Sequence, residues 1–235
     1  LAKYFFKSKN NFIHFDMSEF SESSSVSKLI GSSPGYVGFE QGGLLAEKIS
    51  ENPNSVVLFD EIEKAHPKVH QILLQILDEG RLRDSQGRDA NFRNSIIIIT
   101  GNIGSVTLMK KESLGFGDST LHDRVADARK DLKKVLPLEL INRFDDIVFF
   151  KELSESNLKT IVRHELQHLT EHATKNGITL AFDSTIEDFI VDNIGDLSFG
   201  ARLIKRAVQN KITDQLSLKF VKNPKIKDYS VRYNK

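Results

Sequence analysis

Two adjacent carboxylates, Asp60 and Glu61, follow the apolar run at 55–59 and are well placed to do chemistry. A run this short, rich in β-branched and large apolar side chains, is typical of a buried strand. Ligands of parallel sheets collect at the carboxyl ends of the strands, where both acids would lie. There, one acid can support Mg²⁺ and its neighbour can activate water for nucleotide hydrolysis. Alternatively, the acids cap the next helix, and the strand alone favours neither interpretation.

The composition is that of an ordinary folded protein. The chain has 235 residues, 39% hydrophobic and 28% charged, enough for one large domain or a domain with a smaller lobe. Its 33 basic and 32 acidic residues give a net charge of +1, which offers no electrostatic reason to expect nucleic acid or a membrane as partner. The chain has no cysteine, which excludes disulfides and thiolate chemistry.

Membrane spans and secretion are not expected. No apolar run approaches the ~20 residues that cross a bilayer, and no signal peptide is recognisable, although the chain does not begin with Met. We expect a cytoplasmic protein, or one in the stroma of a plastid or other organelle.

Strands and helices alternate through the first part of the chain, which predicts an α/β layered domain over 1–150 with a parallel sheet. Strands are predicted at 12–16, 55–59, 95–100 and 146–150, and helices at 44–49, 67–79 and 124–135. The strand that contains Ile96 to Ile99 is expected to be buried on both faces. The segment 105–121 is expected to be irregular.

The composition changes after Lys151, which predicts a small, mostly helical lobe over 151–235. Ser154 is expected to cap a long helix. A short strand at 178–180, helices at about 184–193 and 200–222, and an edge strand at 229–233 complete this second domain.

Seven motifs in register resemble the Clp class of AAA+ unfoldases. The apolar strand with its two acids and the next helix, 56–67, resemble the Walker B region. The others are 16–20, 35–38, 80–82, 92–94, 141–143 and 200–202. The match is to the second, C-terminal ATPase module, so the resemblance implies an AAA+ P-loop-type large subdomain over 1–150 and a lid subdomain over 151–235.

The resemblance assigns five hydrolytic roles. Asp60 would hold the water shell of Mg²⁺, and Glu61 would polarise the attacking water. Asn102 would be sensor 1, Arg143 an arginine finger that acts on the neighbouring subunit, and Arg202 the sensor 2 residue. The structural alternatives are a turn asparagine, a surface ion pair and a solvent-facing arginine at a helix start.

The resemblance also implies a substrate loop at Gly35, Tyr36, Val37 and Gly38. In this family the tyrosine lines the pore of a homo-hexamer and grips an unfolded polypeptide by contact area rather than specific hydrogen bonds. Alternatively, Tyr36 is an ordinary loop aromatic that folds back on the surface. The polar segment 80–88 would be a second pore loop.

Leu114, Gly115 and Phe116 resemble the loop by which protease-associated Clp unfoldases bind the ClpP peptidase. An exposed apolar hook of this kind can dock in a partner's pocket. The alternative is a loop anchored to its own core. Because ClpB-type disaggregases lack this tripeptide, it favours a ClpC-like over a ClpB-like protein.

A Gly-rich Walker A loop, which would cradle the phosphates, does not occur in this sequence. In the family it lies directly before a Leu-Ala-Lys like that at 1–3, so we expect the chain to begin just after it. The family's first strand, central between the strands ending at Asn102 and containing Ile147, would also be missing. We therefore expect ATP hydrolysis from the complete protein, and poor stability and no hydrolysis from this segment alone.

The leading hypothesis is an ATP- and Mg²⁺-dependent unfoldase that threads proteins through a hexamer pore into a ClpP-type peptidase, with adaptor proteins as candidate partners. The first alternative is a ClpB-like disaggregase that works without a protease. The second is a non-hydrolysing module used for assembly or binding.

Overall fold

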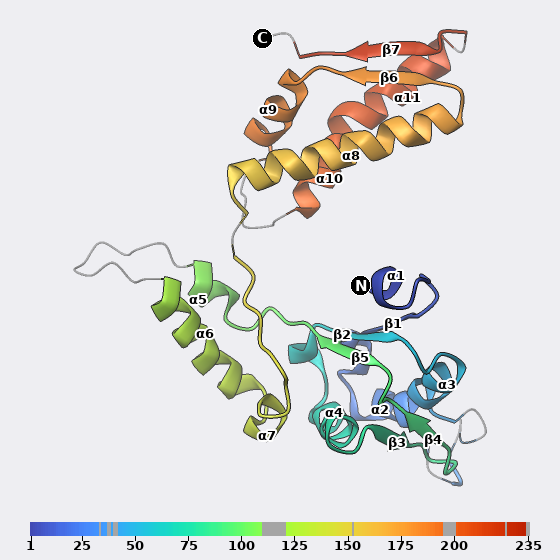
Figure 1. The fold of residues 1–235 in the computed structure, drawn as a ribbon, viewed down its shortest axis with the longest axis vertical. Helices are drawn as coiled ribbons and strands as arrows, with labels where there is room; N and C mark the ends of the chain where they lie inside the picture. Colours follow the sequence, from blue (N-terminus) through green and yellow to red (C-terminus); the bar gives the residue numbers. More distant parts are fainter. Residues whose placement is uncertain are drawn as a thin grey trace. The chain divides into compact units, whose positions relative to one another are not determined.

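The computed structural model describes residues 1–32, 34–36, 39, 42–109, 121–151, 153–194, 201–223 and 225–233. The chain folds into two compact units, Leu1–Phe149 and Phe150–Lys235 (Figure 1). Each unit has its own hydrophobic core, and no described residue belongs to both cores. Among the described residues, no helix combines the length and the apolar character that crossing a membrane would require.

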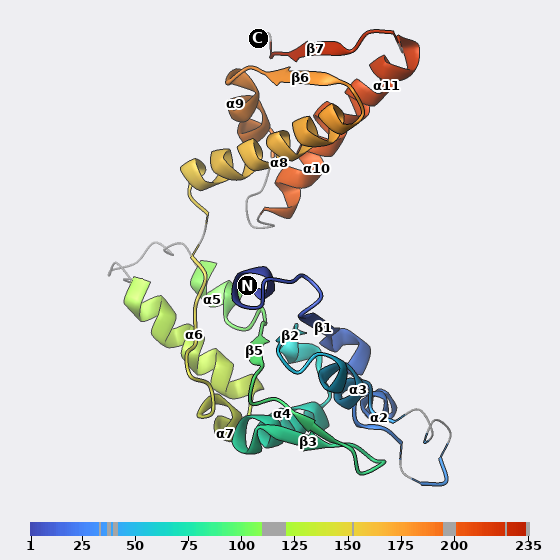
Figure 2. The same cartoon turned by 45° about the vertical axis from the view of Figure 1, so that its right-hand side comes forward.

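The first unit is built on a parallel sheet, as predicted. Its strands β1 (Phe12–Asp16), β2 (Val56–Asp60) and β5 (Ile96–Ile99) lie in the order β1-β2-β5 (Figures 1 and 2). Asp16 pairs in register with Asp60, and both are the last residues of their strands. The carboxyl ends of the strands therefore meet at one edge of the sheet.

One face of this sheet packs against helices. Ile13, Phe15, Val57 and Phe59 alternate with outward-facing residues and are almost fully buried, since successive side chains of a strand point to opposite faces. The helices on this side are α2 (Ser23–Ile30), α3 (Leu44–Glu51) and α4 (Pro67–Glu79) (Figures 1 and 2).

Helix α4 begins and ends where the sequence predicts. Pro67 occupies the first turn, where its missing N–H costs nothing. Gly80 ends the helix in the left-handed conformation, with φ 67° and ψ 19°. Between them, Val69, Ile72 and Ile76 face the core at helical spacing.

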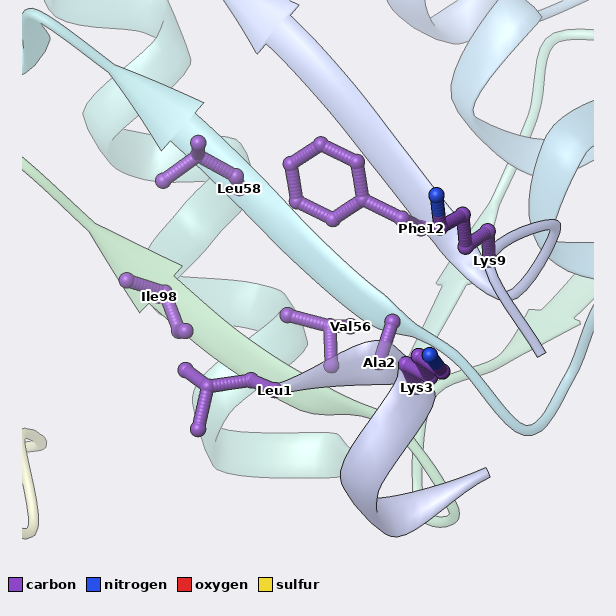
Figure 3. A pocket seen from close by; sticks show the side chains of 8 residues that line it. All are labelled: Leu1, Ala2, Lys3, Lys9, Phe12, Val56, Leu58 and Ile98. Atoms are coloured by element: carbon purple, nitrogen blue, oxygen red, sulfur yellow. The ribbon is translucent and has the colours of Figure 1, made fainter. Parts of the chain in front are cut away.

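The other face of the sheet is partly open, which corrects the expectation that the isoleucine strand is buried on both faces. All four residues of β5 are only half-buried. A hollow of about 480 Å³ lies on this face, between the strands and the short helix α1 (Ala2–Phe5) (Figure 3). Its lining is Leu1, Ala2, Lys3, Lys9, Phe12, Val56, Leu58 and Ile98.

Two predictions about secondary structure in this unit are wrong. The segment 146–150 is not a strand, and Val148 and Phe150 are 67% and 87% exposed. A strand needs a hydrogen-bonding neighbour, and none of the strands in the described ranges pairs with this segment. The segment predicted to be irregular begins with a helix, α5 (Ser105–Met109).

The other elements in the described part of this unit are a hairpin, two further helices and two 3₁₀ turns. The hairpin, which spans the polar segment, joins β3 (Arg81–Arg83) to the antiparallel β4 (Asp89–Asn91). Helices α6 (Leu121–Val135) and α7 (Leu138–Ile141) follow α5. The 3₁₀ turns are η1 (Met17–Phe20), after β1, and η3 (Ile62–Lys64), after β2.

The second unit is mostly helical, as predicted. Its long helix α8 (Glu155–Lys175) starts at Ser154, whose hydroxyl accepts a hydrogen bond from Asn157 N–H at 3.2 Å. Strands β6 (Thr179–Phe182) and β7 (Asp228–Val231) pair in parallel. Between them lie α9 (Thr185–Asp192), α10 (Arg202–Val208) and α11 (Asp214–Lys222), with a π-helical turn, η5 (Gln209–Thr213), joining the last two.

Candidate functional site

Asp60, at the carboxyl end of β2, receives a contact from each neighbouring strand. Its Oδ1 accepts a hydrogen bond from the hydroxyl of Thr100, the residue directly after β5. Its Oδ2 lies 3.4 Å from Nε2 of His14, on β1. The side chain is still 39% exposed. The carboxylate is thus fixed in direction and open to solvent, an arrangement that suits a metal-bound water.

Glu61 adopts a backbone conformation that is rare for a residue with a side chain. Its φ of 58° and ψ of 51° lie in the left-handed region, which costs a non-glycine residue about 1–3 kcal/mol. Glu61 Oε2 lies 2.5 Å from Lys64 Nζ, and this hydrogen bond raises the pKa of Lys64 above its usual value. The turn therefore aims the Glu61 carboxylate differently from a continuing strand.

Neither acid caps the next helix. Glu61 makes no side-chain cap bond to η3, and the Asp60 carboxylate bonds across the sheet instead. The capping alternative therefore does not account for the pair.

Asn102 is joined to the turn after β2 through Glu63. Its backbone N–H donates to Glu63 Oε1 at 3.1 Å. Gly101 permits this approach, because a Cβ there would lie 2.8 Å from Glu63 Oε2. The same Oε2 is buried without a hydrogen-bond partner. The ends of β2 and β5 are thus linked by a carboxylate as well as by the sheet.

The two predicted arginines lie elsewhere. Arg143 is on the turn after α7 and forms an ion pair with Asp78, in the last turn of α4; their side chains are 54% and 36% exposed. Arg202 is the first residue of α10, in the second unit, and is exposed.

Tyr36 is 73% exposed and follows Gly35, which has a φ of 90°. Its ring is therefore not packed into a hydrophobic core. Val37 and Gly38, of the predicted pore loop, lie outside the described residues. The predicted docking residues Leu114, Gly115 and Phe116 also lie outside them.

The hollow of Figure 3 is separate from the two acids. It is lined almost wholly by apolar side chains, and Phe12 and Val56 belong to the opposite, amino-terminal ends of their strands. Within the described ranges, no cluster of three or more His, Asp or Glu residues could hold a metal ion by itself.

Sequence reasoning missed five residues that contact the predicted ones: His14, Glu63, Lys64, Thr100 and Asp78. Thr100 could have been found from the sequence, because it directly follows the strand beside β2 and parallel strands end at the same edge of the sheet. The spacing of three residues between Glu61 and Lys64 also carries a signal. The contact from Asp78 to Arg143 spans separate elements and has no local signal.

Each of the two units matches a known protein family. Residues 1–147 match the family described as AAA domain (Cdc48 subfamily), and residues 153–232 match the C-terminal, D2-small domain of ClpB protein. These two matches confirm the predicted fold class, an AAA+ domain followed by a small helical domain.

The chain is similar to several curated proteins. It is 44% identical to Chaperone protein ClpB of Mycoplasma genitalium, over 100% of this chain and 31% of that protein. It is 41% identical to Chaperone protein ClpB 1 of Nostoc, over 95% and 25%. It is 42% identical to the ATP-dependent Clp protease ATP-binding subunit ClpC of Staphylococcus saprophyticus, over 92% and 27%.

The chain thus spans about a quarter to a third of the length of these relatives. ClpC and ClpB proteins match equally well, and most of the relatives carry the name ClpB, so the expected preference for ClpC is not supported. The matches to both units, and the identity of more than 40% to these relatives, show that the chain belongs to the Clp class of AAA+ ATPases.

Proposed function

We propose that this chain is the ATP-hydrolysing module of a ClpB-like chaperone, which extracts polypeptides from aggregates without a partner protease. Membership of an AAA+ ATPase family implies ATP binding. The observation that carries the proposal is the Asp60–Glu61 pair. Both acids sit at the carboxyl end of β2, and neither is used as a helix cap.

The residues present fit an ATP-bound Mg²⁺. This ion usually keeps several waters and is held by one or two carboxylates together with substrate phosphates. A single part-exposed carboxylate, Asp60, meets that need, whereas a protein-only metal cage would require more acids. When bound, Mg²⁺ would neutralise charge on the phosphates during transfer.

Glu61 would orient the attacking water and accept its proton. In the present arrangement its carboxylate is paired with Lys64, so hydrolysis requires that it leave this partner or share it. Asn102 would orient the same water through its amide without adding charge. Its backbone position relative to the acids is fixed by the bond to Glu63.

Arg143 would act on the nucleotide of a neighbouring subunit, and Arg202 would contact nucleotide from the small domain. A fixed guanidinium neutralises charge that develops on the transferred phosphoryl group. The exposure of Arg143, and its pairing with Asp78 in the last turn of α4, support action between subunits of a homo-hexamer.

Tyr36 would grip the polypeptide that the hexamer moves. An exposed ring on a loop offers contact area to any sequence. Adaptor proteins and unfolded proteins would be the partners of such a machine.

A second candidate is a ClpC-like unfoldase that feeds a ClpP-type peptidase. The 42% identity to a ClpC protein and the Leu114–Gly115–Phe116 tripeptide favour it. Co-purification with a ClpP-type peptidase that is lost in Phe116→Ala would support this candidate. Reactivation of aggregates without any peptidase would favour the ClpB-like proposal.

The central test is the Glu61→Gln variant of the complete protein. We expect it to bind ATP with unchanged affinity and to lose hydrolysis, since the amide orients water but does not accept its proton. Glu51→Gln, an exposed change at the end of α3, is the matched control and should hydrolyse ATP normally. If the unmodified protein binds ATP but does not hydrolyse it, the chain is a non-hydrolysing binding module instead.

A further inference from the structure

Thr100 touches every residue of the turn that carries the two acids. Its N–H donates to Phe59 C=O at 2.9 Å, and its C=O accepts from Ile62 N–H at 3.0 Å. Its hydroxyl donates to Asp60 Oδ1 and accepts from Glu61 N–H at 3.4 Å. One residue after β5 therefore brackets four consecutive residues at the end of β2.

The two backbone bonds of Thr100 continue the sheet, and any residue at this position could make them. The two hydroxyl bonds need a side chain that both donates and accepts, which of the β-branched residues threonine alone provides. Valine has nearly the same shape, but it cannot replace the hydroxyl. A single substitution, Thr100→Val, can therefore remove the two hydroxyl bonds and keep the two backbone bonds.

The hydroxyl acts where the backbone is strained. Glu61 is in the left-handed region, and such a conformation persists only where its surroundings enforce it. Thr100 binds the N–H of that residue and the carboxylate of the residue before it. One oxygen atom thus contacts both the Asp60 carboxylate, which His14 also contacts, and the turn at Glu61.

We propose that Thr100 is a positioning residue for hydrolysis, holding Asp60 toward the metal water shell and Glu61 toward the attacking water. This inference rests on the proposed ATPase function and adds a residue to it. Thr100 does not touch the reacting atoms in this role. It acts through the two acids, where a displacement of about 1 Å can lower a rate by about 100-fold.

The test uses the intact protein with Thr100→Val, Thr100→Ser and Thr107→Val. We expect Thr100→Val to lower kcat by about 10- to 100-fold, with little change in KM or in the binding of a fluorescent ATP analogue. Thr100→Ser keeps the hydroxyl and should restore most of the rate. Thr107 is a matched control, because its hydroxyl also donates to a carboxylate, Asp131 at 2.6 Å, and Thr107→Val should leave kcat unchanged.

A second readout is hydrogen exchange at the Glu61 amide, which needs no turnover. Thr100→Val should speed this exchange by about five- to tenfold, as expected for one lost hydrogen bond, and Thr100→Ser should not. A wild-type kcat in Thr100→Val would overturn the proposal, as would a loss that serine does not rescue. If the unmodified protein does not hydrolyse ATP, the proposed function fails. In that case, unchanged Glu61 exchange in Thr100→Val would overturn the positioning role separately.

Discussion

Arg143 is paired with Asp78 of its own chain. Its proposed role is to reach the nucleotide of a neighbouring subunit. Both side chains are substantially exposed, and an exposed pair of this kind contributes about 0–1 kcal/mol. Arginine fingers contribute about 10³–10⁵-fold to turnover, which corresponds to several kcal/mol. Phosphate from a neighbour would therefore draw Arg143 away from Asp78 at small cost.

Arg143→Ala should lower ATP turnover of the assembled protein by about 1,000-fold or more, with nucleotide affinity nearly unchanged. Asp78→Asn should leave turnover within about twofold, since it removes only the weak internal partner. Steady-state ATPase assays measure both.

Mixing subunits tests whether Arg143 acts between them. Arg143→Ala and Glu61→Gln variants are each expected to be inactive. In a mixed hexamer, an intact Arg143 from one can meet an intact Glu61 from the other, so activity should reappear. Mixtures that stay as inactive as the separate variants would place Arg143 in its own subunit's site.

Asp84 should make the stability of the first unit sensitive to acid. Burial raises the pKa of this carboxyl, but hydrogen bonds from Arg88, Gly43 and Gln86 outweigh burial, so its pKa lies below the ordinary 3.8. Because the folded value is the lower one, the carboxylate stabilises the fold fully above about pH 4. That contribution is lost as the pH falls through the folded pKa.

Asp84→Asn should therefore destabilise the first unit by about 1.5–3 kcal/mol at pH 7, the range for hydrogen bonds to a charged group. The difference from wild type should shrink below pH 4. Denaturant unfolding followed at pH 7 and at pH 3 measures both values. Asp89→Asn, on the same hairpin, removes an exposed pair with Arg83 and should change stability little; an equal loss in the two variants would contradict the argument.

The sequence predicted those elements whose signals are local. Pro67 and Gly80 bound α4, and Ser154 starts α8, because each acts through its own backbone geometry. The parallel sheet follows from short apolar strands separated by helices. The prediction of a strand at 146–150 is wrong because a strand must pair with a neighbouring strand, and the residue pattern does not show whether one is present.

The site was predictable in its acids but not in what holds them. Asp60 and Glu61 stand out because two carboxylates end an apolar strand. The left-handed turn at Glu61 gives no signal, since glutamate is not a residue that favours it. Contacts from His14 and Thr100 depend on strand order and register, which only the folded sheet defines.

The second unit should lose stability without affecting the first. Ile190 is fully buried in a core that shares no residue with the first unit. Ile190→Ala should cost about 2–5 kcal/mol and Ile190→Val about 0.5–1.5 kcal/mol, because the cavity grows with the deleted volume. Hydrogen exchange resolved by peptide measures the effect: faster exchange should be confined to 150–235. Equal acceleration in β1 and β2 would show that the two units unfold together.

Tyr36 should be needed for work on substrate but not for hydrolysis. Its ring is exposed and belongs to a loop, and the contacts that hold Asp60 and Glu61 come from other residues, His14, Thr100 and Lys64. Tyr36→Ala removes the contact area and should abolish reactivation of aggregated protein while ATP turnover stays within about twofold, because the ring contributes through area rather than hydrogen bonds. Tyr36→Phe keeps the ring and should retain most of the reactivation.

Reactivation of aggregated luciferase, assayed beside ATPase, separates the two activities. Parallel loss of ATPase and reactivation in Tyr36→Ala would instead make this loop part of the nucleotide site, and full reactivation in that variant would remove Tyr36 from the substrate path.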